Sequence, residues 1–132
     1  MKISTILGAR PQFIKASLIS KKIRELEGIE ETIVHTGQHF DWNMNNVFFE
    51  ELDIPTPHYN LGISNLTHGA MTGRMIEATE KVFLETQPDW VLVYGDTNST
   101  LAGAIAAAKL GIPIIHIEAG LRSDNPMMPE EI

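Results

Sequence analysis

The chain has 132 residues, enough for one domain whose core needs no disulfide or metal. Hydrophobic residues make up 43% and charged residues 20%, a globular balance that excludes disordered and fibrous classes. The net charge of −7 and ten scattered Lys and Arg residues argue against nucleic-acid binding, and no segment approaches the ~20 apolar residues of a membrane span. The absence of cysteine removes disulfides and cysteine-ligated zinc, and fits a cytosolic protein.

The first half of the chain alternates strand-like and helical segments. Residues 2–7 read as a short strand, and Pro11 is placed to start a helix over about 12–27, with Gly28 as its stop. Residues 30–37 are a second strand-like run, and residues 39–54 suit a short amphipathic helix packed over the sheet. Residues 55–65, with two prolines and a glycine, are loop-like.

The second half continues the alternation. Apolar residues recur at helical spacing over about 66–87, although Gly69 and Gly73 weaken the first turns. Residues 89–95 form a continuous apolar strand, a helix over about 97–110 ends at Gly111, and residues 112–118 form another buried strand. The pattern predicts an α/β fold with a largely parallel sheet and right-handed crossovers.

The chain reads as a single unit, residues 1–132, without repeats or a dividing linker. Its last residues contain a Pro-Glu-Glu sequence that is typical of a helix start. We therefore expect the chain to be the front portion of a longer protein.

Three polar segments follow predicted strands: "GARPQ", "GDTNS" and "HIEAGLR". In open parallel sheets, ligands bind beyond the carboxyl ends of the strands, where helix N-termini direct their amide groups outward. The three segments should therefore share one edge of the sheet, which makes that edge the candidate functional site.

Two cations lie in or just after the first segment. Arg10 would project from the turn and Lys15 lies one turn into the helix, an arrangement that could cradle a diphosphate. The alternative is that Arg10 pairs with an acidic neighbour and Lys15 is a solvated helix residue. The spaced glycines of a dinucleotide site are missing, so no cofactor is expected.

Two acids follow the later strands. Asp96 either caps the next helix, worth about 1 kcal/mol, or faces a ligand while Thr97 or Ser99 provides the cap. Glu118, at the end of a buried strand, is costly to leave unpaired, so it either forms a salt bridge with Arg122 or belongs to a site.

Histidines give weaker signals. His116 and Glu118 alternate onto one face of their strand, but without cysteines or a third ligand at suitable spacing we expect no metal site. Gln38 and His39 lie in the turn after the second strand, at the ligand edge, and are either site residues or ordinary loop residues. Spacing identifies no partner for the other histidines, which are His35, His58 and His68.

Four ordered motifs carry a resemblance that runs from one end of the chain to the other. They are "GARPQFIK", "TGQHFD", "PDWVLVYGDTNSTLAGAIAAAKLGIPIIHIEAGLRS" and "MPEEI". Together they resemble the bacterial non-hydrolysing UDP-N-acetylglucosamine 2-epimerases. The resemblance implies two Rossmann-like domains facing each other across a cleft, the glycosyltransferase-B arrangement, with this chain as most of the N-terminal one.

The same resemblance implies a reaction: interconversion of UDP-GlcNAc and UDP-ManNAc by elimination of UDP and its re-addition. Carboxylates would stabilise the positive charge that develops at the anomeric carbon, and a base would move the C2 proton. By the match of motifs, Asp96, Glu118 and Glu130 are the catalytic acids, with Glu131 the alternative if the match slips by one residue. Arg10 and Lys15, with Asp96 and Glu118, contact the nucleotide sugar.

Further expectations also follow from the resemblance. Gln38 and Arg74 are candidates for a regulatory UDP-GlcNAc site, although Asp41 stands where members with that site carry another Gln. The second domain would supply a catalytic histidine and most uridine and diphosphate contacts, so residues 1–132 alone should be inactive, and the whole protein a homodimer. The rival functions are a glycosyltransferase of the same fold, a hydrolysing epimerase and a non-catalytic binding domain.

Overall fold

The computed structural model describes residues 1–8, 10–37, 57–63 and 66–117, with only the backbone for residues 10–15. Strands and helices alternate along these residues. Their bounds, in chain order, are β1 (Lys2–Leu7), α1 (Arg10–Glu25), β2 (Glu30–His35), β3 (Tyr59–Asn60), α3 (His68–Thr86), β4 (Trp90–Tyr94), α4 (Asn98–Lys109) and β5 (Ile114–Ile117).

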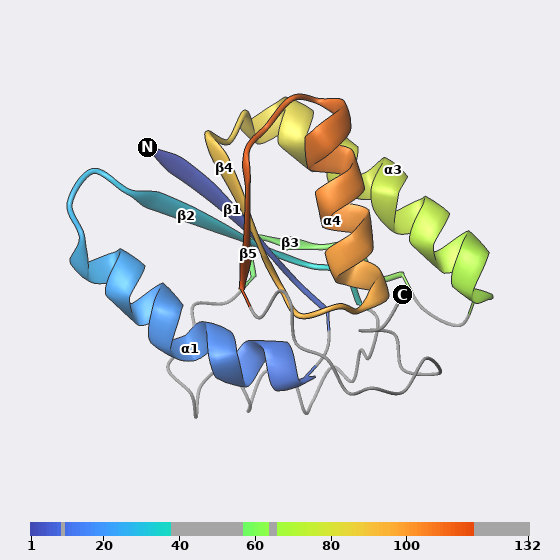
Figure 1. Ribbon diagram of the computed structural model, residues 1–132, viewed down its shortest axis with the longest axis horizontal. Coiled ribbons are helices and arrows are strands. Elements are labelled where there is room, and N and C mark those ends of the chain that lie inside the picture. Colours follow the sequence, from blue (N-terminus) through green and yellow to red (C-terminus); the bar gives the residue numbers. More distant parts are fainter. Residues whose placement is uncertain (9, 38–56, 64–65, 118–132) are drawn as a thin grey trace.

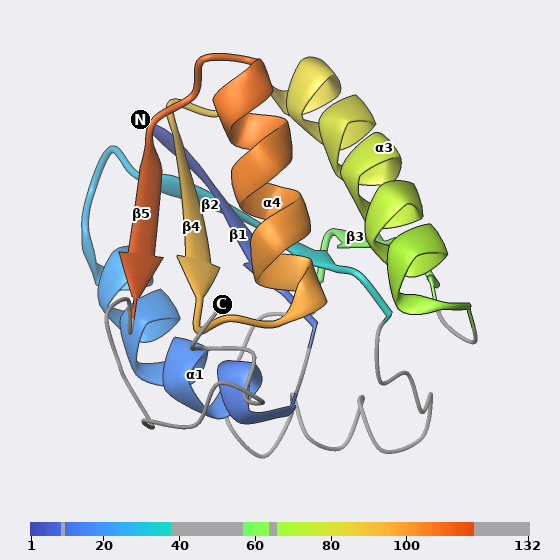
Figure 2. The same ribbon diagram turned by 45° about the vertical axis from the view of Figure 1, so that its right-hand side comes forward.

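The strands form one parallel sheet in the order β3-β2-β1-β4-β5. The chain runs outward from β1 through β2 to β3, and then crosses back to place β4 on the other side of β1. Figure 2 shows β4 and β5 ending at the same edge, from which the chain enters α4. The strand order reverses between β1 and β4, and this reversal is where open α/β sheets hold their ligands.

Helices cover both faces of the sheet. Helix α1 packs on one face, while α3 and α4 lie side by side on the other (Figure 1). Alternate residues of β1 serve the two faces: Leu7 joins the core beneath α1, and Ile6 joins the core beneath α4. Apolar strands such as 91–94 are buried throughout because both of their faces are covered.

Small residues bring α4 close to the sheet. Ala102, Ala106 and Ala107 are fully buried, and a Cβ on Gly103 would lie 3.0 Å from Ile6 Cγ1. This close packing fixes the start of α4 beside the carboxyl end of β4.

The predicted α/β class with a Rossmann-like parallel sheet is confirmed, and the predicted strands and helices in the described ranges appear within a few residues of their expected bounds. The predicted burial of the strand over residues 112–118 was wrong, because β5 comes last in the strand order and its residues are exposed or half-buried. The expectation that residues 55–65 are only a loop was wrong, because Tyr59–Asn60 pairs with Val34–His35 as β3. The helix predicted over residues 39–54 falls outside the described residues.

Candidate functional site

The carboxyl ends of β1, β2 and β4 meet at one edge of the sheet, as their parallel pairing requires. Gly8, Thr36 and Gly95 directly follow these strands. Helices α1 and α4 start three and four residues beyond the ends of β1 and β4, and α3 starts on the same side. We call this region the carboxyl edge; its helix N-termini carry partial positive charge, which favours an anionic ligand.

The turn after β4 is held by hydrogen bonds on both sides. The Thr100 hydroxyl donates to the Tyr94 carbonyl at 2.5 Å, and the Gly95 N–H donates to the Ile117 carbonyl at 2.9 Å. The Gly95 carbonyl accepts from His116 Nε2. Gly95 has φ +66°, in the left-handed region that favours glycine. Side chains of α4 and β5 therefore fix a turn that glycine alone would leave flexible.

Thr97, rather than Asp96, caps helix α4. The Thr97 hydroxyl accepts from the Thr100 N–H at 3.4 Å, and the Thr100 hydroxyl accepts from the Thr97 N–H at 3.3 Å, which makes a capping box. The sequence left open whether Asp96 is the cap, and the structure gives that position to Thr97. Asp96 is exposed and precedes the cap.

Asp96 lines a cavity of about 370 Å³ at the start of α4. The cavity lies between α4 and the end of β5, so it contains polar groups of the turn and apolar groups of the helix. Its lining residues are Gly95, Asp96, Thr97, Asn98, Thr100, Leu101, Ala104 and His116. A carboxylate and an imidazole therefore share one cavity beside a helix N-terminus.

The turn after β1 and the first turn of α4, which belong to the segments "GARPQ" and "GDTNS", contact each other. The buried hydroxyls of Thr36 and Ser99 lie 2.8 Å apart, which joins the end of β2 to the first turn of α4. A Cβ on Gly8 would lie 1.9 Å from Ser99 Oγ and 2.7 Å from Thr36 Oγ1. The turn after β1 thus approaches α4 more closely than any other residue type would permit.

Arg74 lies at a different cavity of about 310 Å³, lined by Gly62, Ile63, Leu66 and Arg74. Among the described residues, the linings of the two cavities have none in common. The helices that border them are nonetheless linked at their first residues, because Asn98 Nδ2 lies 3.1 Å from His68 Nδ1. Arg74 therefore belongs to the neighbourhood of Asp96 but not to its cavity.

The other predicted site residues are only partly placed. Arg10 and Lys15 lie in the first two turns of α1, which begins directly beyond the carboxyl end of β1, but their side chains are outside the described part. Gln38, Glu118 and Glu130 fall outside the described residues. The convergence of the three acids on one cavity therefore stays a prediction.

Two buried titratable groups lie near the same edge on the α1 face. Burial lowers the pKa of His35, against a smaller opposing contribution from the Asn60 side chain. Burial, with a contribution from the Glu31 charge, raises the pKa of Tyr94 above its usual 10. Both side chains are thus held in their neutral forms beneath the sheet end.

The sequence missed several histidine contacts because their partners are distant in the chain. His58 Nδ1 accepts from the Ile33 N–H at 3.1 Å, and His68 and His116 make the contacts given above. For His116, the only signal was its alternation with Glu118. The described residues contain no group of three or more His, Asp or Glu side chains placed to hold a metal ion. None of the helices in that part is long and apolar enough to cross a membrane.

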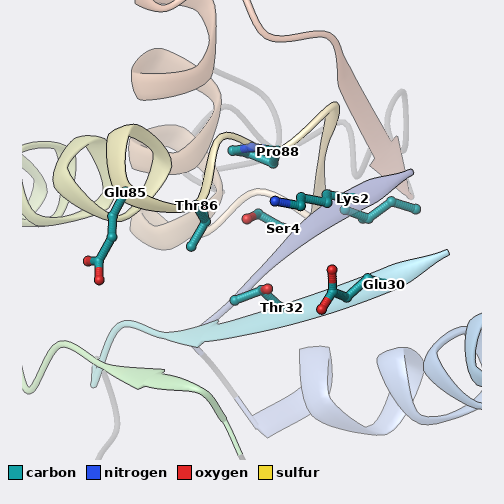
Figure 3. Close-up of a pocket in the computed structure, with 8 residues that line it drawn as sticks. Lys2, Ser4, Glu30, Thr32, Glu85, Thr86 and Pro88 are labelled. Carbon is teal, nitrogen blue, oxygen red and sulfur yellow. The ribbon is translucent and has the colours of Figure 1, made fainter.

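A third cavity, of about 180 Å³, lies at the opposite edge, where the strands begin (Figure 3). We call it the amino edge. Lys2 and Ser4 of β1 lie beside their partners Glu30 and Thr32 of β2 in its lining, and the end of α3 closes one side. Neither Asp96 nor Arg74, the two predicted site residues whose side chains the structure describes, lines this cavity.

Comparison with known proteins finds similar sequences along the whole chain. Residues 21–132 match the family model described as UDP-N-acetylglucosamine 2-epimerase. The chain is 66% identical over 132 residues to a UDP-2,3-diacetamido-2,3-dideoxy-D-glucuronate 2-epimerase of Pseudomonas aeruginosa, and 53% identical to a UDP-N-acetylglucosamine 2-epimerase of Methanocaldococcus jannaschii. It covers 37% and 36% of these proteins, and they cover all of it.

Solved structures of proteins with the same family name also match this chain. The crystal structure of the Methanocaldococcus jannaschii UDP-GlcNAc 2-epimerase in complex with UDP-GlcNAc and UDP matches with a TM-score of 0.92 and 52% identity, over 99% of this chain and 36% of that one. The Neisseria meningitidis enzyme bound to UDP-GlcNAc matches with a TM-score of 0.90 and 33% identity, over the same shares. This chain therefore spans about a third of the length of its relatives, and it belongs to the UDP-N-acetylglucosamine 2-epimerase family.

Proposed function

We propose that residues 1–132 form most of the N-terminal Rossmann-like domain of a glycosyltransferase-B type enzyme that inverts C2 of a UDP-2-acetamido sugar. The observation that carries the proposal is the position of Asp96. It lines a cavity at the start of α4, beyond the reversal of strand order, in a chain 52% identical to an enzyme solved with UDP-GlcNAc and UDP. A carboxylate there can stabilise positive charge on a sugar, while the helix N-terminus favours the diphosphate.

The reaction proposed is elimination followed by re-addition. A base removes the proton from C2, the bond between the anomeric carbon and the UDP oxygen breaks, and a double bond forms between C1 and C2. UDP then adds back to C1, and a proton returns to C2 from the opposite face, which turns UDP-GlcNAc into UDP-ManNAc. Glu118 and Glu130 would share the acid and base work with Asp96, without one assignment per residue, because neighbouring carboxylates titrate as a set.

Binding would use the cations at the start of α1. Arg10 and Lys15 begin the helix that follows β1, so they are candidates for the diphosphate contacts. Gln38 and Arg74 are candidates for a second, regulatory nucleotide-sugar site, and Arg74 lines a cavity of its own. We further propose a homodimer that acts in the cytoplasm on free nucleotide sugar without a metal or cofactor.

A second substrate is favoured by one specific observation. The relative at 66% identity is named for UDP-2,3-diacetamido-2,3-dideoxy-D-glucuronate, whereas three relatives named for UDP-N-acetylglucosamine are 59%, 55% and 53% identical. Both names describe inversion at C2 of a UDP sugar, so the same carboxylates would serve. The substituents at C3 and C6 would decide between them.

Incubation of the full-length enzyme in heavy water tests the proposal. Each UDP sugar is supplied separately, and NMR follows deuterium at C2. We expect deuterium in both epimers of the preferred substrate and no net release of UDP. Net release of UDP with free ManNAc would instead indicate a hydrolysing epimerase. Absence of exchange at C2, with sugar transfer to an added acceptor, would indicate a glycosyltransferase.

The part played by the second domain is tested on residues 1–132 alone. Because most uridine and diphosphate contacts are assigned to that domain, titration with UDP-GlcNAc should reveal at most weak binding and no turnover. Micromolar affinity together with turnover would contradict the domain assignment.

A further inference from the structure

We infer that His116 is a positioning residue for Asp96: its Nε2–H holds the Gly95 carbonyl and thereby sets the direction in which the Asp96 carboxylate enters the cavity. The inference rests on the proposed catalytic role of Asp96. It assigns His116 a task in the turn after β4, whereas its place in the sequence indicated only a shared strand face with Glu118.

The contact joins two adjacent strands at their carboxyl ends. His116 is the third residue of β5 and pairs with Val93 of β4, and its imidazole reaches past the end of β4 to the Gly95 carbonyl. The Gly95 N–H donates to the Ile117 carbonyl of the same strand at 2.9 Å. Gly95 is therefore held by β5 through its N–H and through its C=O.

Holding the Gly95 carbonyl fixes Asp96 because the two share a peptide plane. The Gly95 C=O and the Asp96 N–H are the ends of one rigid unit, so rotation of that unit moves the Asp96 Cα and its side chain. Gly95, at φ +66°, has no Cβ to resist such a rotation. The residue on the other side, Thr97, is already fixed by its capping box with Thr100. The His116 contact, with the bond from the Gly95 N–H to Ile117, restrains the side that precedes Asp96.

The geometry also defines the tautomer of His116. A carbonyl oxygen only accepts hydrogen bonds, so Nε2 must carry a hydrogen. His116 and Asp96 both line the 370 Å³ cavity, from β5 and from the turn. A change at His116 would therefore act on the reacting geometry at Asp96, and misplacement of a catalytic group by about 1 Å costs on the order of 100-fold in rate.

Two variants of the full-length enzyme test the inference. Gln reaches a similar distance and keeps an N–H donor, whereas Met has similar length and no donor. We expect His116→Met to lower kcat by about 10- to 100-fold with KM changed by less than about threefold, and His116→Gln to recover kcat to within about threefold of wild type. Wild-type kcat in His116→Met, or equal losses in both variants, would overturn the inference.

A matched control exists at the other end of the sheet. His58 also uses its imidazole to bind backbone, through the Ile33 N–H, but it lies beside β2, away from Asp96. His58→Met should lower thermal stability and keep kcat within about twofold of wild type. A fall in kcat equal to that of His116→Met would show that loss of either imidazole lowers kcat by destabilising the fold as a whole. That result would overturn the inference.

One measurement needs no variant. Nitrogen NMR of the wild-type enzyme labelled at histidine should find His116 with hydrogen on Nε2, and a neutral ring with hydrogen only on Nδ1 would overturn the inference even if His116→Met fails to fold.

Asp96→Asn is assayed in parallel. If Asp96→Asn is inactive and His116→Met fully active, the positioning role fails and the proposed function stands; if Asp96→Asn is fully active, the proposed function fails.

Discussion

The two edges of the sheet have similar strands and opposite surroundings. At the amino edge, strand starts are joined mainly through exposed backbone: the Glu30 N–H donates to the Met1 carbonyl, and Lys2 and Asp89 exchange two hydrogen bonds of 2.8 Å. At the carboxyl edge, the hydroxyl groups of Thr36, Ser99 and Thr100 are buried and hydrogen-bonded between elements. The described contacts at the amino edge are thus exposed and include one side chain, that of Asp89, whereas buried side-chain hydroxyls join the elements at the carboxyl edge.

The difference follows from strand direction. In a parallel sheet with helical crossovers, helices begin at the carboxyl edge and end at the amino edge, so outward N–H groups gather at the first and carbonyl groups at the second. The proposed UDP-sugar ligand carries a diphosphate, which the helix N-termini at the carboxyl edge would favour. In the described part of the chain, the amino-edge cavity has two carboxylates, of Glu30 and Glu85, beside the end of α3 and a single cation, Lys2.

The largest effect expected from this comparison is on activity. Asp96→Asn and Asp89→Asn make the same chemical change at opposite edges. Asp96→Asn should lower kcat of the full-length enzyme by about 10²- to 10⁴-fold, because an amide neither moves a proton nor stabilises positive charge as a carboxylate does. Asp89→Asn retains an oxygen that can accept from the Lys2 N–H, and should leave kcat unchanged. The rates of both variants are measured by C2 exchange. Equal kcat values would contradict the proposal that the catalytic carboxylate lies at the carboxyl edge.

A steric change at the carboxyl edge should come next in size. Gly8→Ala places a Cβ 1.9 Å from Ser99 Oγ and 2.8 Å from Ser99 Cβ, and Ser99 is short, buried and bound to Thr36, so the elements themselves must move. We expect a loss of about 1–3 kcal/mol in the free energy of unfolding, measured with urea. An unchanged midpoint would mean that the first turn of α4 is free to shift, against the close packing described.

The third effect is a pH dependence at the end of β2. Burial lowers the pKa of His35 in the folded protein below the 6.5 of an exposed histidine, so the unfolded chain takes up the proton first as pH falls. Stability should therefore decline as pH falls below about 6.5 toward the folded-state pKa, by at most about 1.4 kcal/mol per pH unit for one group.

His35→Gln isolates this effect, because it keeps a polar side chain that does not titrate. Between pH 8 and pH 5, the free energy of unfolding of wild type should fall relative to that of His35→Gln. The contributions of titratable groups that both proteins contain cancel in this difference. A difference that stays constant over that range would contradict a lowered pKa for His35.

Much of the sheet could be predicted because each strand is a local apolar run. Strand β4 and residues 2–7 needed no distant information. β3 could not be found in this way, since its two residues pair with β2 through backbone groups that every residue carries, and the flanking prolines are typical of a loop. The extended pairing beside it depends on the His58 imidazole, which no spacing rule anticipates.

The site was predictable as an edge and not as a set of contacts. Strand direction alone brings the turns after β1 and β4 together, and the structure agrees at Gly8 and Ser99. The cap of α4 depends on the helix starting one residue later than an Asp96 cap would need, and Asp96 and Thr97 are both suitable cap residues. The contact of His116 with Gly95 spans 21 positions, and the pair of Thr36 and Ser99 spans 63. These contacts depend on tertiary packing.

The smallest expected effect is a stabilising one. Gly73 lies on the exposed side of α3, and a Cβ added there would meet no atom within 4 Å. Gly73→Ala should therefore raise the free energy of unfolding by about 0.5–1 kcal/mol, because alanine restricts the unfolded chain and favours the helix. Urea unfolding of both variants compares the same substitution at two sites. We expect the free energy of unfolding to rise in Gly73→Ala and to fall in Gly8→Ala. If both variants lost stability equally, the penalty at Gly8 would reflect loss of glycine flexibility rather than the contact between the β1 turn and α4.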